Sequence, residues 1–167
     1  MPDELNTCIK HVLDRAKVAG ASAAEAAASA DTGLSVTARI GDVETLEYHK
    51  DQGVAITVFF GQRKGSASTS DLSESSLQET VAAACRIARY TEEDPCTGLA
   101  DPDLMAYDYP DLDLDHPWDV SADQAVEMAI RTEAAALERD DRITNSDGGS
   151  VNSFRGSVAY GNSHGFM

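Results

Sequence analysis

The chain has 167 residues, of which 42% are apolar and 25% are charged, and its formal net charge is −16. A chain of this length buries about two-thirds of its unfolded surface, so it can form a core without disulfides or metals, as one domain or as two small ones. The acidic surplus repels phosphate backbones and anionic membrane surfaces. We therefore expect neither a nucleic acid nor a membrane as partner.

The cysteines and the first residues bear on the cellular compartment. Cys8, Cys85 and Cys96 are odd in number, widely spaced and without a Cys-x-x-Cys pair. The segment MPDELNTCIK lacks a basic stretch followed by an apolar run, and no apolar stretch approaches the length of a membrane span. These features predict free thiols in a reducing cytoplasm.

The first third of the chain changes from helical to strand periodicity. Apolar residues recur at helical spacing from Leu5 to Ala16, and Gly20 ends this predicted helix. The next segment, ASAAEAAASAD, is compatible with a strand or with a second helix. From Gly33 the period is two, and Gly41 and Gly61 lie in turns. The pattern predicts an antiparallel meander of short strands that include GLSVTARI, VETLEYHK, GVAITVFF and RKGSASTS.

Two further helices and a long loop follow. Ser73 is the predicted start of one helix, and Ser121 with Gln124 forms a capping-box pattern at the start of another. Residues 91–120 between them are acidic, irregular and rich in proline, which predicts a surface loop or linker, and Leu112 and Leu114 are its expected anchors. The closing segment RITNSDGGSVNSFRGSVAYGN predicts a hairpin around its two adjacent glycines.

This order of elements predicts an α+β fold, an antiparallel meander sheet packed with two to three helices.

One short motif, GNSHG, matches the nucleophile-elbow pattern Gly-x-Ser-x-Gly around Ser163. That motif requires a helix directly after the turn, with catalytic Asp and His residues further downstream. Only Phe166 and Met167 follow Gly165 in this sequence. We interpret Ser163 as a turn residue and not as a nucleophile.

The sequence also does not match the patterns for metal and phosphate binding. The four histidines are isolated from one another, so no zinc signature is present. A calcium loop that began at Asp111 would need glycine and glutamate where the chain has His116 and Ala122. Lys64-Gly65-Ser66 reverses the order of a phosphate-binding loop. We therefore predict no catalytic residue and no metal ligand in this chain.

Several stretches, taken together, resemble a known family. GLSVTARIGDVETLEYHKDQGVAITVFFGQRKGSASTSDLS, IARYTEEDPCTGLADPDL, DLDLDHPW and RITNSDGGSVNS with GNSHGF are similar to the N-terminal region of the TldD/PmbA metallopeptidase family, long labelled modulators of DNA gyrase. The resemblance covers essentially the whole chain and is closest to the PmbA-like (TldE-like) arm. It implies that residues 1–167 form an N-terminal α+β domain and that a larger C-terminal domain is absent from this chain.

The resemblance also implies a function. Family members work as a cytoplasmic complex of a TldD-like and a PmbA-like subunit, which degrades unfolded peptides and trims leader peptides. The zinc-binding His-Glu-x-x-x-His motif belongs to the TldD-like arm, so the resemblance implies no cofactor in this chain. We expect a non-catalytic part of the PmbA-like subunit. The alternative is a freestanding protein-binding module that modulates DNA gyrase or another regulator.

Two segments are candidates for peptide binding through their backbones. RKGSASTS, with Ser66 and Ser68, offers small side chains that allow another strand to approach closely, provided that it is an edge strand and not an internal strand paired on both sides. SVAYGNSHG, with Asn162, Ser163 and His164, is the second candidate.

Overall fold

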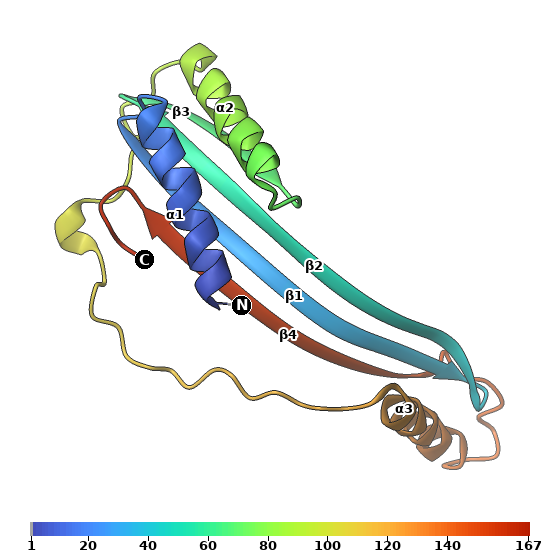
Figure 1. The fold of residues 1–167 in the computed structure, drawn as a ribbon. Coiled ribbons are helices and arrows are strands. Elements are labelled where there is room, and N and C mark those ends of the chain that lie inside the picture. The colour runs from blue at the N-terminus through green and yellow to red at the C-terminus, as the bar shows by residue number, and fades with distance from the viewer. Residues whose placement is uncertain (1) are drawn as a thin grey trace. The chain divides into compact units, whose positions relative to one another are not determined.

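The computed structural model describes residues 2–167, which form three α-helices, four strands and one short 3-10 helix (Figure 1). In chain order these elements are α1 (Pro2–Val18), β1 (Ala23–Arg39), β2 (Asp42–Phe60), β3 (Arg63–Thr69), α2 (Glu74–Tyr90), η1 (Pro102–Leu104), α3 (Ala122–Leu137) and β4 (Gly149–Asn162). The strands form one sheet in the order β3-β2-β1-β4. The predicted α+β class is confirmed: β1, β2 and β3 form the meander, and β4 adds to its β1 side.

The strands are longer than the sequence pattern indicates. The segment ASAAEAAASAD, which was compatible with a helix or a strand, belongs to β1. Gly53 does not end a strand, because β2 continues through it from Asp42 to Phe60. Gly53 lies within β2 and is not among the glycines with positive φ, so it sits in ordinary extended backbone. A Cβ atom there would meet only the Thr69 carbonyl oxygen, at 3.4 Å. The expectation of two short strands at this place is wrong.

The predicted hairpin around Gly148 and Gly149 is also wrong, because β4 runs as a single strand from Gly149. Both glycines instead allow a close approach of other backbone. A Cβ atom at Gly149 would lie 2.2 Å from the Ala129 carbonyl oxygen of α3, and one at Gly148 would lie 2.5 Å from the Ala38 carbonyl oxygen of β1. Glycine pairs mark turns and tight contacts alike. Here the close contact explains Gly149, and Gly148 has in addition a positive φ of 104°.

The predicted caps and the tight turn between β1 and β2 are present. Ser73 is the N-cap of α2, and its side chain accepts a hydrogen bond from the Ser76 backbone nitrogen. Ser121 and Gln124 form a complete capping box at the start of α3. Ile40 and Gly41 turn the chain between β1 and β2 with φ angles of 51° and 80°. Positive φ at both positions matches the twist of a two-residue hairpin.

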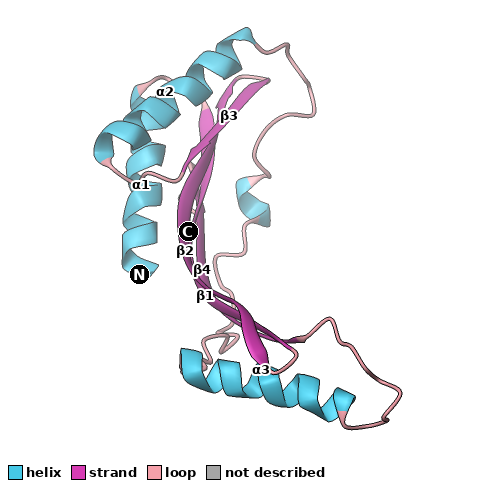
Figure 2. Ribbon diagram, turned by 90° about the vertical axis from the view of Figure 1, so that its right-hand side faces the viewer, coloured by secondary structure: helices cyan, strands magenta, loops and turns pink. Residues whose placement is uncertain are grey.

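The chain divides into two compact units, and β1, β2 and β4 each contribute residues to both. Unit 1 comprises the residues up to Ala30, Asp51–Asp111 and Ser157–Met167. In this unit, α1 and α2 lie on one side of the strands and the short helix η1 lies on the other (Figure 2). Its core fills the space between the helices and the strands, and its largest fully buried side chains are Ile9, Val12, Ile56 and Val58.

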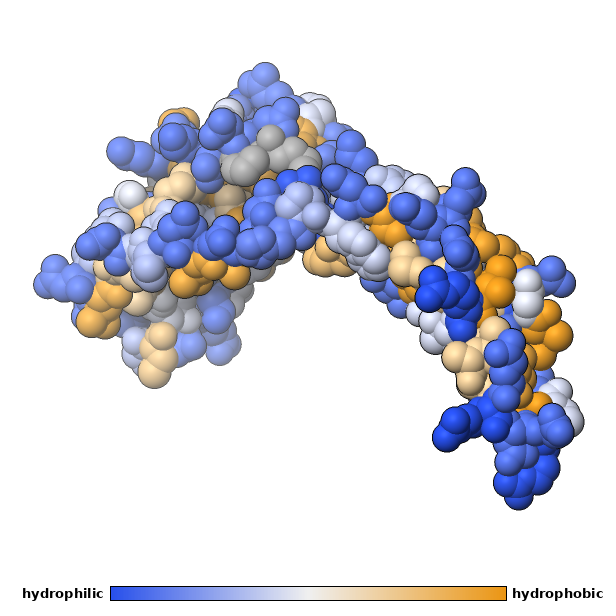
Figure 3. All heavy atoms as spheres, turned by 90° about the horizontal axis from the view of Figure 1, so that it is seen from below, coloured by the Kyte–Doolittle hydropathy of each residue, from blue (hydrophilic) through white to orange (hydrophobic). Residues whose placement is uncertain are grey.

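Unit 2 comprises Asp31–Lys50 and Leu112–Gly156. Its core is small and consists of Leu34, Val36 and Ala38 from β1 with Ala125 and Ala129 from α3. The expected anchors of the acidic loop do not contribute to it: Leu112 is 66% exposed and Leu114 is 81% exposed. The anchor interpretation is therefore wrong. Apolar side chains reach the surface among polar ones in the space-filling view (Figure 3).

No helix among residues 2–167 is both long enough and apolar enough to span a membrane.

Candidate functional site

The first candidate peptide-binding segment is an edge strand. β3 is the outermost strand of the sheet and pairs antiparallel with β2, from Val54 opposite Thr69 to Phe60 opposite Arg63. Within residues 2–167, no other strand lies on its far side. The alternative of an internal strand paired on both sides is thereby excluded for the described part of the chain.

The register shows which backbone groups of β3 point outward. The Phe59 carbonyl oxygen of β2 accepts a hydrogen bond from the Ser22 nitrogen, so the backbone groups of Phe59 point away from β3. Backbone direction alternates along a strand, so Thr57 and Ala55 also point away from β3. Their partners in β3 are Ser66 and Ser68. In an antiparallel pair, the backbone groups of two opposed residues point either toward each other or away from each other. The N–H and C=O groups of Ser66 and Ser68 therefore point away from β2, toward the outside of the sheet.

The two faces of β3 differ. On one face α2 lies close, because a Cβ atom at Gly65 would be 2.3 Å from the Ala84 carbonyl oxygen and 2.4 Å from the Ala88 nitrogen. On the other face the Ser66 hydroxyl lies 2.9 Å from that of Thr57, and Ser66 and Ser68 are exposed. A strand added to this edge would have α2 near one of its faces and the small polar side chains of Ser66 and Ser68 near the other.

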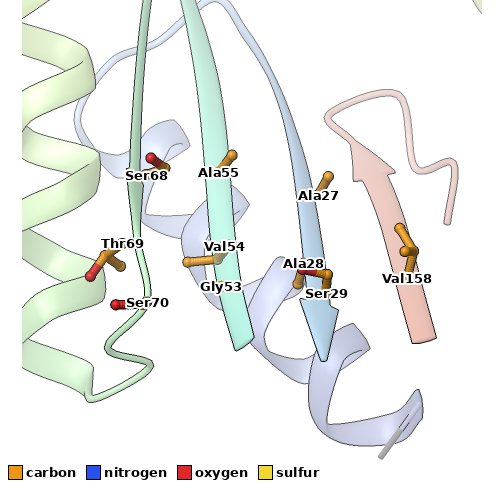
Figure 4. Close-up of a pocket in the computed structure, with 10 residues that line it drawn as sticks. All are labelled: Ala27, Ala28, Ser29, Gly53, Val54, Ala55, Ser68, Thr69, Ser70 and Val158. Carbon is orange, nitrogen blue, oxygen red and sulfur yellow. The ribbon is translucent and has the colours of Figure 1, made fainter. Parts of the chain in front are cut away.

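A shallow depression of about 650 Å³ adjoins this edge in unit 1. Figure 4 shows that it reaches across the four strands from Ser68 of β3 through Ala55 and Ala27 to Val158 of β4. The lining side chains are small, and Gly53 and Ser29 extend the depression along the strands. Small side chains leave room for a bulky residue of a ligand and make few specific contacts with it.

The second candidate segment forms a closed turn at the end of β4. The Ser163 nitrogen donates to the Ala24 carbonyl oxygen at 2.8 Å, and the Ala24 nitrogen donates to the Ser163 hydroxyl at 3.0 Å. The Asn162 nitrogen donates to the Phe166 carbonyl oxygen, and the Asn162 side-chain oxygen accepts from the His164 nitrogen. Asn162 is 3% exposed. These backbone groups are already used, so the turn offers less to a peptide than β3 does.

An aromatic cluster holds this turn to the loop that contains η1. The Tyr107 ring lies edge-on to the Phe166 ring at 5.8 Å, and the Tyr160 and Phe166 ring centroids are 5.9 Å apart. The Tyr107 hydroxyl donates to the His164 carbonyl oxygen, and the Tyr160 hydroxyl donates to Glu25. Burial raises the pKa of Tyr160, and the neighbouring carboxylate of Glu25 raises it further. This arrangement keeps the Tyr160 hydroxyl protonated and is structural.

The structure therefore does not bring the two candidate segments together. β3 and β4 are opposite edges of the four-stranded sheet, three strand spacings apart, or about 14 Å at the usual 4.8 Å per step. Sequence reasoning missed the residues that join them, Ala27, Ala55 and Val158. Ala27 and Ala55 alternate with buried neighbours, which was a signal of an open sheet face, but this alternation did not indicate which strands would be adjacent.

Two family models match segments of this chain. Residues 24–88 match the family model described as PmbA/TldA metallopeptidase domain 1, and residues 115–167 match the PmbA/TldA metallopeptidase central domain.

The chain belongs to the PmbA/TldD metallopeptidase family.

Named relatives agree with this assignment. The chain is 51% identical over 164 residues to a protein of Haemophilus influenzae named metalloprotease PmbA homolog, covering 98% of this chain and 36% of that protein. It is 54% identical over 144 residues to metalloprotease PmbA of Escherichia coli O157:H7, covering 86% of this chain and 32% of that protein. The chain thus spans about a third of the length of these PmbA relatives.

Solved structures share the fold. A protein of Bacteroides thetaiotaomicron that is named as a candidate modulator of DNA gyrase superposes with a TM-score of 0.81 at 27% identity, over 98% of this chain and 38% of that one. TldE from Thermococcus kodakarensis superposes with a TM-score of 0.75 at 17% identity, over 95% of this chain and 35% of that one. At that lower identity the likeness to TldE concerns the fold alone.

Within the PmbA/TldD framework, Ser66 and Ser68 lie in the part that matches domain 1, and Asn162 to His164 lie in the part that matches the central domain.

The family name implies a metal, and the described residues do not fit one. Among residues 2–167, no three His, Cys, Asp or Glu side chains are grouped so that they could hold an ion. The His11 ring is engaged by Arg15 at 2.7 Å, and the His49 ring lies where a Cβ atom of Gly33 would be. We derive no reaction step through zinc for this chain.

Proposed function

We propose that this chain forms a non-catalytic, peptide-docking part of a PmbA-like subunit in a cytoplasmic zinc-dependent peptidase complex. Its partner would be a TldD-like subunit that supplies the zinc, and its substrates would be unfolded peptides and leader peptides. A larger C-terminal domain of the same subunit would complete it. Membership of the PmbA/TldD family and the relatives named metalloprotease PmbA support the peptidase assignment.

The outward-facing edge of β3 is the observation that supports a docking role most directly. An unfolded peptide carries unpaired backbone donors and acceptors, and an exposed strand edge presents the matching groups. Ser66 and Ser68 lie on that edge with exposed side chains. No other residue among 2–167 forms a hydrogen bond with the outward backbone groups of these two serines.

The small side chains around this edge suit a substrate of no fixed sequence. Main-chain hydrogen bonds contribute affinity regardless of sequence, whereas side-chain pockets contribute specificity. The depression beside β3 is lined by Ala27, Ala55 and Ser68, which cannot select strongly among side chains. This geometry supports the proposal that the chain accepts unfolded peptides of many sequences.

Proline substitutions test this proposal. Proline removes an N–H group and is tolerated at edge positions that face solvent. In the intact complex with its TldD-like subunit, Ser66→Pro and Ser68→Pro should each raise the KM for an unfolded peptide several-fold and leave kcat nearly unchanged. Steady-state kinetics on a denatured, fluorogenic peptide measures both constants.

Ser66→Ala and Ser68→Ala are the matched controls, because they keep the N–H group and should leave KM unchanged. Circular dichroism and thermal unfolding would establish that each proline variant folds. If both folded proline variants cleave with wild-type KM, β3 is not the docking edge.

The second candidate function is a protein-binding module that modulates DNA gyrase, and it is favoured by the name of the Bacteroides thetaiotaomicron neighbour. The net charge of −16 opposes direct contact with DNA, so such a module would have to bind the gyrase protein. Titration of this chain against purified gyrase without DNA and without a TldD-like subunit separates the two functions. Saturable binding favours the module, and no binding leaves the peptidase assignment.

A further inference from the structure

A half-buried carboxylate, that of Glu25, lies on the open face of the sheet in unit 1. Burial alternates along the start of β1: Ala24 and Ala26 are buried in the core, whereas Glu25 and Ala27 are half-buried on the opposite face. Ala27 lines the depression (Figure 4). Since side chains of one face recur every second residue, Glu25 lies about 7 Å further along the same face.

The aromatic cluster adjoins this carboxylate. The Tyr160 hydroxyl donates to Glu25 Oε2 at 2.8 Å. Phe166 packs against both tyrosines of the cluster, with its ring centroid 5.9 Å from that of Tyr160 and 5.8 Å from that of Tyr107. Both tyrosine rings remain accessible, since Tyr160 is 37% exposed and Tyr107 is 55% exposed. Tyr160 follows Val158, a lining residue, by two positions on β4, so the cluster lies beside the depression.

The Glu25 carboxylate has no counter-charge in the described part of the chain. Among residues 2–167, no lysine, arginine or histidine pairs with it, and its side chain accepts one hydrogen bond, from Tyr160. The loop that carries Tyr107 adds negative charge, because residues 91–111 contain no lysine or arginine, and Asp103 and Asp108 are exposed. A carboxylate that is partly withdrawn from water is usually paired with a cation. This arrangement therefore favours a cationic group supplied by a ligand.

We propose that Glu25, together with the rings of Tyr160 and Tyr107, binds the guanidinium group of an arginine in an unfolded peptide. This inference rests on the proposed peptide-docking function and names the peptides that the chain prefers. A guanidinium is planar, donates parallel hydrogen bonds to a carboxylate and stacks on aromatic rings, which the compact ammonium group of lysine does less well. The small side chains of the depression leave room for the neighbouring residues of the peptide.

Other classes of ligand fit this cluster less well. An anion would be repelled by Glu25 and by the acidic loop. A divalent metal ion needs several ligands, and no three His, Cys, Asp or Glu side chains among residues 2–167 are grouped to hold one. A purely apolar side chain would withdraw the carboxylate from water without replacing its lost hydrogen bonds. A guanidinium satisfies both the carboxylate and the rings.

Two matched peptides test this inference in the intact complex with its TldD-like subunit. They are unfolded, fluorogenic and identical except at one position away from the cleaved bond, which holds arginine or the neutral, similarly shaped citrulline. The KM should be about fivefold lower for the arginine peptide, the size of an exposed charge pair combined with a cation–π contact, with a similar kcat. Glu25→Gln keeps an acceptor for the Tyr160 hydroxyl and removes the charge. It should reduce the ratio to about twofold, the part that the rings contribute.

Three further variants serve as controls. Glu79→Gln removes the same charge from an exposed position on α2 and should leave the ratio unchanged. Tyr107→Leu should lower the ratio, whereas Tyr107→Phe keeps the ring and should not. A wild-type ratio near one, or an equal loss of preference in Glu79→Gln and Glu25→Gln, overturns the inference. Because each ratio compares two peptides on the same variant, a smaller folded fraction does not change it.

The outcomes also separate this inference from the proposed docking edge. Anisotropy of the two labelled peptides, measured after a chelator has removed zinc, gives the same ratio without cleavage. If Ser66→Pro and Ser68→Pro raise the KM of both peptides while Glu25→Gln keeps the arginine preference, the β3 edge stands and the Glu25 site is refuted. If the proline variants have no effect and the preference depends on Glu25, the docking edge fails and the Glu25 site stands.

Discussion

Units 1 and 2 share three strands of one sheet and yet are stabilised differently. In unit 1, two helices cover the strands, and the core contains the fully buried side chains of Ile9, Val12, Ile56 and Val58. In unit 2, one helix packs on a core of five residues, three of which are alanines. The stability of unit 1 therefore rests mainly on apolar burial, and unit 2 depends more on close backbone contact and polar bonds.

The polar part of unit 2 centres on Glu133 of α3. Its carboxylate accepts hydrogen bonds from the Ile40 nitrogen at 2.9 Å and from the Gly41 nitrogen at 3.0 Å, at the turn between β1 and β2. The residue is only 3% exposed. The backbone N–H groups of Gly41 and Ile40 lower the pKa of Glu133. The Glu133 carboxylate thus ties α3 to the turn between β1 and β2.

The largest expected effect separates the two cores. Ile56→Ala in unit 1 should lower the free energy of unfolding by about 3 kcal/mol, because it leaves a cavity beside a side chain that is 1% exposed. Val36→Ala in unit 2 should cost less, about 2 kcal/mol, and should mainly accelerate local opening.

Denaturant unfolding measures the first effect, and amide hydrogen exchange measures the second residue by residue. If Val36→Ala lowered the unfolding midpoint as much as Ile56→Ala, the contrast between the cores would be refuted.

An effect of similar or smaller size is expected at the tight contacts that both units use. A Cβ atom at Gly65 in unit 1 would meet the Ala84 carbonyl oxygen at 2.3 Å, and one at Gly149 in unit 2 would meet the Ala129 carbonyl oxygen at 2.2 Å. Gly65→Ala and Gly149→Ala should each cost about 1–3 kcal/mol, because a helix must move away. Gly53→Ala is the control and should change stability by less than about 0.5 kcal/mol. Thermal unfolding of the three variants measures these changes in stability. If Gly149→Ala left the stability unchanged, α3 would not be closely packed against β4.

The smallest expected effect is the pH dependence of unit 2. Because the pKa of Glu133 is lowered on folding, its ionised form stabilises the folded state above the pKa of an unfolded glutamate. That stabilisation is lost as the pH falls through the lowered pKa. Glu133→Gln keeps the shape and one acceptor, so it should remove this acid sensitivity at a modest cost.

Exchange of the Ile40 and Gly41 amides, followed from neutral to acidic pH, reports the change. An unaltered pH profile in Glu133→Gln would mean that this carboxylate does not hold the turn.

The sequence predicted those elements whose signal is local. Ser73 and Ser121 cap helices as their patterns indicate, since a hydroxyl that bonds an N–H group two or three residues on depends only on near neighbours. The glycine pair at 148–149 was misinterpreted because a hairpin turn and a close contact with other backbone favour the same residue. Leu112 and Leu114 were misinterpreted because an apolar side chain does not indicate whether anything covers it.

The candidate site also has features that the sequence predicted and features that it did not. The small, polar character of RKGSASTS was visible in the sequence, and so was the alternation that makes it a strand. That β3 lies at the edge, with Ser66 and Ser68 facing outward, depends on the order β3-β2-β1-β4. Strand order arises from pairing between residues far apart in the chain.

Composition and local periodicity thus determined the acidic surface, the helix starts and the strand alternation of this protein, and particular sequence stretches carried the family resemblance. Only the tertiary structure decided which strand edges stay unpaired, at which glycines a helix backbone approaches closely, and which carboxylate accepts the N–H groups of a turn. The physical reason is that caps and alternation involve neighbours within a few residues. Strand edges, close backbone contacts and the hydrogen bond that the Ile40 nitrogen donates to Glu133 depend on residues that only the folded chain brings together.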